Sequence, residues 1–145
     1  MTKKKLKGLG LYIGTGLGFK SPLTAVSDEL ENLDVQMNNY NTLPGLGLHK
    51  LNDIFMKIWL ITWRHPLIFD IGYFFAEEIK LTKKFTEIIL YAIFRKHVLK
   101  LIKKENPDFI FSTFFFATYL FSRVVKKYKL NISVYGYNSE VVFAP

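Results

Sequence analysis

The sequence predicts an α/β fold in which a Rossmann-like, mainly parallel sheet carries helices on both faces. Short apolar runs alternate with longer segments of helical periodicity, the order that produces parallel strands joined by right-handed crossovers. A glycine-rich turn also follows the first apolar run and leads into a helix. With 145 residues, half of them apolar, the chain is long enough to bury the core of one domain.

The first strand and helix are predicted from the residues at their boundaries. The apolar run 9–13 is expected to be a core strand rather than part of a signal peptide, because the surrounding segment 6–19 contains five glycines and no small-residue cleavage motif follows. Ser21 and Pro22 are typical of an N-cap and a first helical position, so a helix should begin there and end near Asn32. Its inward residues are expected to be Leu23, Val26 and Leu30.

The later elements follow from apolar periodicity and from helix-ending motifs such as Asn106-Pro107. We expect a strand at 34–37, a loop at 38–47, helices at 48–64, 82–105 and 115–129, and strands at 109–113 and 132–137. The inner face of the helix at 82–105 is expected to consist of Phe85, Ile88, Ile89, Ala92, Leu99 and Ile102.

Charge and composition restrict the function classes. Lys and Arg number 20 against 12 Asp and Glu, a net charge of +8 that indicates an anionic partner, either a membrane or a nucleic acid. No RNA-binding motif interleaves these cations with exposed aromatic residues, so we do not expect nucleic-acid binding. The chain has no cysteine, which excludes disulfides and a thiolate nucleophile. Its three histidines lack metal-ligand spacing, so we predict no metal site.

The helix expected at 48–64 is apolar on all sides beyond Lys57, which is unusual for a surface helix. Aromatic residues with nearby cations are typical of a membrane interface. No segment reaches the roughly 18–20 apolar residues that a spanning helix needs. The predicted membrane-contact residues are Phe55, Trp59, Trp63 and Arg64, and the alternative is a core helix under the sheet.

The glycine-rich turn is a candidate ligand loop. Gly14, Gly16 and Gly18 allow a ligand to approach the backbone closely, and the N–H groups that open a helix can bind an oxyanion or a phosphate. Phe19, Lys20 and Ser21 complete the predicted loop. The spacing differs from the dinucleotide fingerprint, which argues against NAD. The alternative is a tight turn without a ligand, with Lys20 only solvated.

Four stretches in order extend this pattern along nearly the whole chain. They are the loop at 14–21, the apolar aromatic region at 48–76, Glu105-Asn106-Pro107-Asp108 before a strand ending in Ser112-Thr113, and the segment 131–145. This set resembles the monogalactosyldiacylglycerol synthases and the bacterial diacylglycerol glucosyltransferases. The resemblance implies the N-terminal, acceptor-side domain of a GT-B glycosyltransferase, whose two Rossmann-like domains bind acceptor and donor separately.

The resemblance implies a membrane-associated enzyme of glycolipid biosynthesis that transfers a hexose from a nucleotide sugar to a lipid acceptor. It further implies a cytoplasmic, peripheral position at the inner face of the cell membrane, on an anionic lipid surface. Residues 1–145 would be the acceptor-side domain, with the nucleotide sugar on an absent donor domain and no cofactor in this chain. The alternatives are a fragment, one subunit of a split enzyme with a separate donor-domain chain, or a degenerate, non-catalytic remnant.

Several positions depart from the family pattern. Phe19 and Phe114 stand where that pattern has histidines, and no His-Pro follows the last strand. Glycosyl transfer needs a base for the acceptor hydroxyl. The remaining candidates are Asn138 and Glu140, and the alternative for Glu140 is an ordinary loop carboxylate. We therefore expect the chain to be inactive alone.

Overall fold

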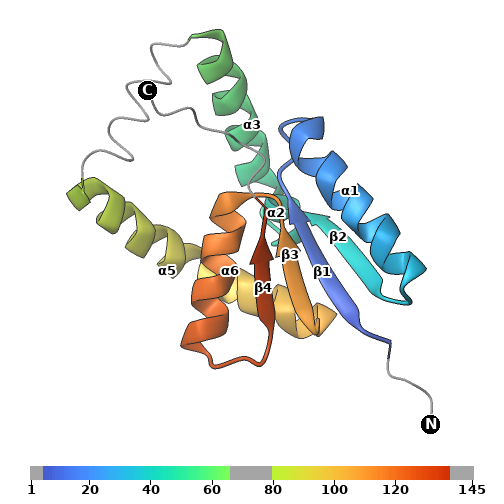
Figure 1. The fold of residues 1–145 in the computed structure, drawn as a ribbon. Coiled ribbons are helices and arrows are strands. Elements are labelled where there is room, and N and C mark those ends of the chain that lie inside the picture. The colour runs from blue at the N-terminus through green and yellow to red at the C-terminus, as the bar shows by residue number, and fades with distance from the viewer. Residues whose placement is uncertain (1–4, 66–79, 138–145) are drawn as a thin grey trace.

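A computed structural model describes residues 5–65 and 80–137, apart from the side chains of Trp63 and of residues 80–87. These residues form a four-stranded sheet in the order β2-β1-β3-β4, and every neighbouring pair is parallel (Figure 1). The strands are β1 (Lys7–Tyr12), β2 (Gln36–Asn41), β3 (Phe109–Ser112) and β4 (Ser133–Gly136). The predicted parallel α/β sheet is confirmed.

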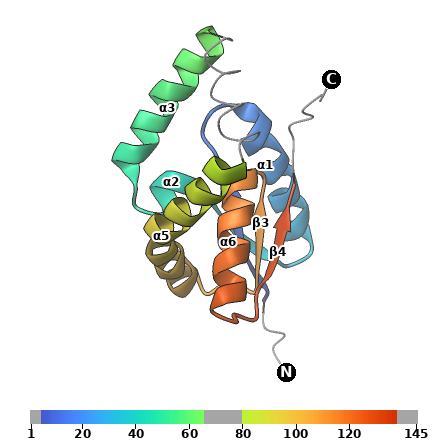
Figure 2. The same cartoon turned by 90° about the vertical axis from the view of Figure 1, so that its left-hand side faces the viewer.

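Helices cover both faces of this sheet. They are α1 (Leu17–Asn32), the short α2 (Thr42–Gly45), α3 (His49–Arg64), α5 (Lys80–Glu105) and α6 (Phe115–Lys127). Figures 1 and 2 show α5 and α6 on one side of the sheet and α1 on the other. This arrangement follows from right-handed crossovers, because β1 to β2 moves one way across the sheet and the later connections move the other way.

Strand β2 corrects the sequence prediction. It begins at Gln36 rather than Asp34, and it continues through residues 38–41, which were expected to be loop. Pairing with β1 aligns Leu9 with Asn38 and Tyr12 with Asn41. Asparagine has a low β propensity. The parallel backbone pairing with β1 outweighs that local preference.

Helix α1 begins at Leu17, five residues before the predicted first helical position, Pro22. Gly16 is its N-cap, so Ser21 is not a cap and Pro22 lies inside the helix. Proline lacks the N–H that would bond to the carbonyl four residues earlier, and its ring crowds that position. Here that residue is Gly18, which is exposed and has no side chain, so its carbonyl remains accessible to water. The buried residues of α1 are Phe19, Leu23 and Ser27, whereas Val26 and Leu30 are half-buried.

The remaining predicted helices and strands are confirmed within a few residues. The predicted inner face of α5 is confirmed only at Ile102, and the side chain of Phe85 lies outside the described residues. The buried residues of α5 are Phe94, Val98, Leu101 and Ile102. Ile88, Ile89 and Ala92 are exposed, contrary to expectation, and Leu99 is half-buried. The cause is visible in Figure 1, where the C-terminal half of α5 lies over the sheet and the N-terminal half projects beyond it.

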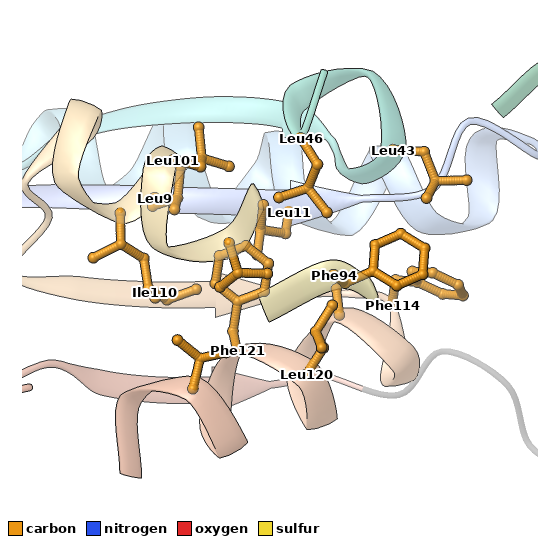
Figure 3. Close-up of a cluster of buried hydrophobic side chains, with 14 of the residues drawn as sticks. Leu9, Leu11, Leu43, Leu46, Phe94, Leu101, Ile110, Phe114, Leu120 and Phe121 are labelled. Atoms are coloured by element: carbon orange, nitrogen blue, oxygen red, sulfur yellow. The ribbon is translucent and has the colours of Figure 1, made fainter. Parts of the chain in front are cut away.

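The main hydrophobic core fills the space between the sheet and the α5/α6 layer (Figure 3). Leu9 and Leu11 of β1, Ile110 of β3 and Phe121 of α6 are all completely buried. Because side chains alternate along a strand, Gly10, which lies between these two leucines, faces α1 instead, and a Cβ added there would stand 3.0 Å from Leu23 Cδ1. The two faces of the sheet are therefore built differently.

Candidate functional site at the carboxyl edge of the sheet

The parallel sheet brings the carboxyl ends of all four strands to one edge. Ligands of open α/β sheets bind outside this edge. The residues that follow the strands here are the loop 13–16, Thr42, the segment 113–115 and Tyr137. This edge is therefore the candidate site, and it includes the predicted glycine loop.

Two buried polar atoms meet this edge at the ends of β1 and β2. Asn41 lies over Gly14, where an added Cβ would stand 2.6 Å from Asn41 Nδ2. The Thr15 hydroxyl oxygen and Asn41 Oδ1 are both buried without a hydrogen-bond partner among the described residues. Buried polar atoms normally have a partner, because leaving one unmet costs roughly 1–3 kcal/mol. Both atoms therefore have unmet hydrogen-bonding capacity within the described fold.

The first turn of α1 forms the open side of the loop. The first N–H groups of a helix have no intrahelical partner. A Cβ added at Gly18 would meet nothing within 4 Å, so the packing of the described chain does not require glycine there. Lys20 and Ser21 are exposed on α1 within two turns of its start. The structure thus brings Gly14, Gly16, Gly18, Lys20 and Ser21 to one edge.

Phe19 turns inward instead of joining the open loop. Its ring meets that of Phe114 edge-to-face, with centroids 6.2 Å apart and an interplanar angle of 77°. The Thr113 hydroxyl donates to the Phe19 carbonyl at 2.6 Å and so joins the loop to the end of β3. Both positions that depart from the family's histidines therefore lie in contact and form an apolar wall.

Apart from the exposed Lys20, the described part of this edge offers no carboxylate, imidazole or amine that could act as a general base. Residues 13–19, 42–46, 113–119 and 136–137 contain no carboxylate, histidine or amine. Asn138 and Glu140, the predicted base candidates, lie outside the described residues and stay predictions.

Helix α3 projects past this edge of the sheet (Figure 1). Ile54, Ile58 and Ile61 point outward and are 54%, 55% and 51% exposed. This spacing of four and three residues places them on one stripe of the helix. The neighbouring stripe consists of the exposed residues Lys50, Asp53, Lys57 and Arg64, three cations and one carboxylate.

The predicted aromatic contacts of α3 lie nearer to the body of the protein. Phe55 is half-buried against the core, and the Trp59 ring stacks on it with centroids 6.1 Å apart. The side chain of Trp63 lies outside the described residues. The isoleucine stripe was not among the residues predicted from the sequence, although its i, i+4, i+7 spacing beside several cations was a usable signal. Contact of any of these residues with a membrane stays a prediction.

A polar cluster fastens β2 to the end of α5. The Tyr40 hydroxyl donates to Glu105 Oε1 at 2.7 Å, and Asn38 Nδ2 donates to Glu105 Oε2 at 2.8 Å. The Tyr40 hydrogen bond is the main cause that lowers the pKa of Glu105, against the opposing effect of burial. The same bond raises the pKa of Tyr40. Because its donors are all satisfied within the fold, we assign this cluster a structural role.

The described residues contain neither a metal-binding cluster nor a membrane-spanning helix. Within residues 5–65 and 80–137, no three His, Asp or Glu side chains gather closely enough to hold a metal ion. Over the same ranges, no helix combines the length and the apolar character that crossing a membrane requires.

Comparison with known proteins identifies a matching family. The family model described as monogalactosyldiacylglycerol (MGDG) synthase matches residues 28–136, from within α1 to the end of β4. The glycine loop lies before the matched segment. Searches of curated proteins and of solved structures gave no match. The matched segment is most of the chain and contains three of the four parallel strands, so the chain belongs to the monogalactosyldiacylglycerol synthase family and corresponds to its N-terminal domain.

Proposed function

We propose that this chain is the acceptor-binding side of a glycosyltransferase that moves a hexose from a nucleotide sugar to a lipid. It acts as a peripheral protein on an anionic membrane surface, at the cytoplasmic face of the cell membrane. The family supports glycolipid glycosyl transfer. The observation on which the membrane part rests is the exposed isoleucine stripe of α3 beside several cations.

The stripe has the chemistry of a lipid contact. Transfer of apolar surface from water contributes roughly 25 cal/mol per Å², so exposed isoleucines gain from entering the headgroup region. Each Lys or Arg near an anionic surface adds about 1 kcal/mol. Since α3 projects beyond the carboxyl edge, a membrane under α3 would bring a lipid headgroup toward the glycine loop (Figure 1).

The loop suits the polar end of such an acceptor. Thr15 and Asn41 supply hydrogen-bonding atoms, while Phe19 and Phe114 form an apolar wall next to them. The base for transfer is then Glu140, Asn138 or a group on the donor side. That donor side, which would bind the nucleotide sugar, is proposed to be a separate domain or chain.

The Phe19–Phe114 contact favours a second candidate, an acceptor-binding subunit or remnant without catalysis of its own. The two candidates differ in one assay. With its donor side present, a catalytic chain should support hexose transfer to lipid, whereas a non-catalytic chain should bind lipid without any transfer. Loss of that transfer on Glu140→Gln would then identify Glu140 as the base.

Vesicle co-sedimentation tests the membrane proposal. Wild type should sediment with phosphatidylglycerol vesicles and much less with neutral phosphatidylcholine vesicles. Ile54→Ser/Ile58→Ser should lower partitioning about tenfold, because the substitutions remove apolar surface that would enter the lipid. Leu33→Ser is the matched control, since Leu33 is 72% exposed at the end of α1 and should not matter.

Equal partitioning of wild type and the isoleucine variant would contradict the membrane proposal, provided that circular dichroism shows both proteins to be folded. Isoleucine variants are preferable to Trp59→Ala, because Trp59 stacks on a residue of the core and its loss would disturb the fold.

A further inference from the structure

A hollow of about 300 Å³ lies at the carboxyl ends of β3 and β4, next to the apolar wall. Its lining consists of Phe115, Thr118, Tyr119, Gly136 and Tyr137. These residues provide three aromatic rings and three hydroxyl groups, without one aliphatic chain. Phe115 is 58% exposed and Tyr137 is 49% exposed, so large aromatic faces are presented to solvent.

The hollow is held open by the fold. The backbone N–H of Tyr137 donates to the Ser112 carbonyl at 2.8 Å, which continues the sheet to the rim of the hollow. A Cβ on Gly136 would stand 2.6 Å from Thr118 Cγ2, so β4 approaches α6 at a residue without a side chain. The Phe115 ring packs against Phe114 with centroids 5.3 Å apart.

An arginine fixes the polar side of the hollow. The Arg123 guanidinium lies over the rings of Tyr91 and Tyr119, 4.7 Å and 5.8 Å from their centroids. It also donates to the Tyr119 hydroxyl oxygen. Cation–π contacts with both rings restrain the Arg123 guanidinium. The restrained guanidinium in turn restrains the Tyr119 hydroxyl to which it donates. Tyr119 is thereby oriented before any ligand arrives.

We propose that this hollow binds a pyranose ring, an inference that deepens the proposed function by naming the part of its substrate recognised there. A pyranose has an apolar C–H face that stacks on aromatic rings and a rim of hydroxyls that exchange hydrogen bonds with phenols and threonine. Ligand sites combine an apolar lining with a few placed polar groups in this way. The ring belongs either to a sugar-bearing lipid acceptor or to the nucleotide sugar.

An acyl chain suits the hollow less well. It would cover the exposed Tyr137 hydroxyl without replacing its hydrogen bonds with water, which is unfavourable. The other two hydroxyls are already oriented by the fold, because Thr118 donates to the Phe114 carbonyl at 3.2 Å and the Tyr119 oxygen accepts from Arg123. The aliphatic surface that an acyl chain prefers lies instead on α3, at Ile54, Ile58 and Ile61.

Ligand-observed NMR titration tests the proposal on the full chain. The probes are methyl β-D-galactopyranoside, methyl β-D-glucopyranoside, a UDP-hexose and dihexanoylglycerol. At least one methyl pyranoside should show saturable binding, and Tyr119→Phe and Phe115→Leu should each weaken it fivefold or more. Tyr135→Phe is the matched control, because Tyr135 is an exposed tyrosine of β4 outside the hollow and should leave binding unchanged.

The other probes identify the source of the sugar. Tighter binding of UDP-hexose than of either methyl pyranoside, equally sensitive to Phe115→Leu, supports the pyranose site and assigns it to the donor. Binding of dihexanoylglycerol alone, or no saturable binding of any sugar by folded wild type, overturns it. The vesicle experiment is independent, because Phe115→Leu should leave partitioning unchanged, so failure of either proposal can be recognised separately.

Discussion

The two faces of the sheet are packed by different means, although they share the same central strand. On the α5/α6 face, Leu9 and Leu11 of β1 join a continuous apolar core. On the α1 face, the same strand presents Gly8 and Gly10. One face is stabilised by filling volume with large side chains, and the other by bringing backbone and helix close together.

A side-chain hydrogen bond takes part in the packing where the apolar layer is thin. On the α1 face, Asn39 Nδ2 donates to the Ser27 hydroxyl at 2.7 Å, directly above Gly10. The faces also differ in charge, because residues 88–104 and helix α6 contain no carboxylate, whereas α1 carries Asp28, Glu29 and Glu31. Burial of large apolar side chains therefore does not explain the packing of both faces. On the α1 face, the close contact at Gly10 and the Asn39–Ser27 hydrogen bond take its place.

The largest expected effect lies on the α5/α6 face. Phe121→Ala removes a completely buried ring and should lower the free energy of unfolding by about 4 kcal/mol, because the cavity adds to the lost burial. Leu23→Ala on the α1 face should cost less, about 2–3 kcal/mol. Urea denaturation measures both. A larger loss for Leu23→Ala would show that the α1 face is the main core after all.

Gly10→Ala tests the close approach on the α1 face. The new Cβ would stand 2.0 Å from Asn39 Oδ1 and 3.0 Å from Leu23 Cδ1, so Asn39 must move and release Ser27. We expect a loss of about 2 kcal/mol, as for other overpacked sites. Shortening the clashing side chain should recover part of it, so Gly10→Ala/Asn39→Ala should be less destabilised than the sum of the single variants. Strict additivity in this cycle would exclude the proposed contact.

The polar cluster on the α5 side predicts a pH dependence. Because the folded-state pKa of Glu105 is lowered, its contribution is complete above its ordinary pKa and is lost as pH falls through the folded value. Between pH 7 and pH 3, the urea midpoint of wild type should fall more steeply than that of Glu105→Gln. Glu31, which is exposed on α1, provides the control variant Glu31→Gln. Parallel curves for wild type and Glu105→Gln would contradict the assignment.

The smallest expected effect is a gain at the glycine loop. Gly18→Ala meets no atom within 4 Å and lies in a helical position, so it should stabilise the fold by about 0.5 kcal/mol. The same methyl group would occupy space open to a ligand, so binding of the lipid acceptor should weaken. Thermal unfolding and acceptor binding are measured on one preparation. Higher stability with unchanged binding would indicate a turn without a ligand.

The sequence by itself determined the order of strands and helices, the parallel sheet and the family. Local signals sufficed for these features, since apolar periodicity and Asn106-Pro107 mark elements regardless of what packs on them. The glycine loop was also predicted, but its polar partner Asn41 was not, because asparagines in a row indicate a loop when only neighbours in sequence are considered.

Only the tertiary structure decided which faces meet. Strand β2 forms through its asparagines because β1 supplies the backbone hydrogen bonds, and the inner face of α5 depends on which half of the helix lies over the sheet. Thr113 and Phe19 are 94 residues apart in sequence, yet their hydrogen bond closes the candidate site. Periodicity shows which residues favour burial, but a partner that distant becomes a neighbour only when the chain folds.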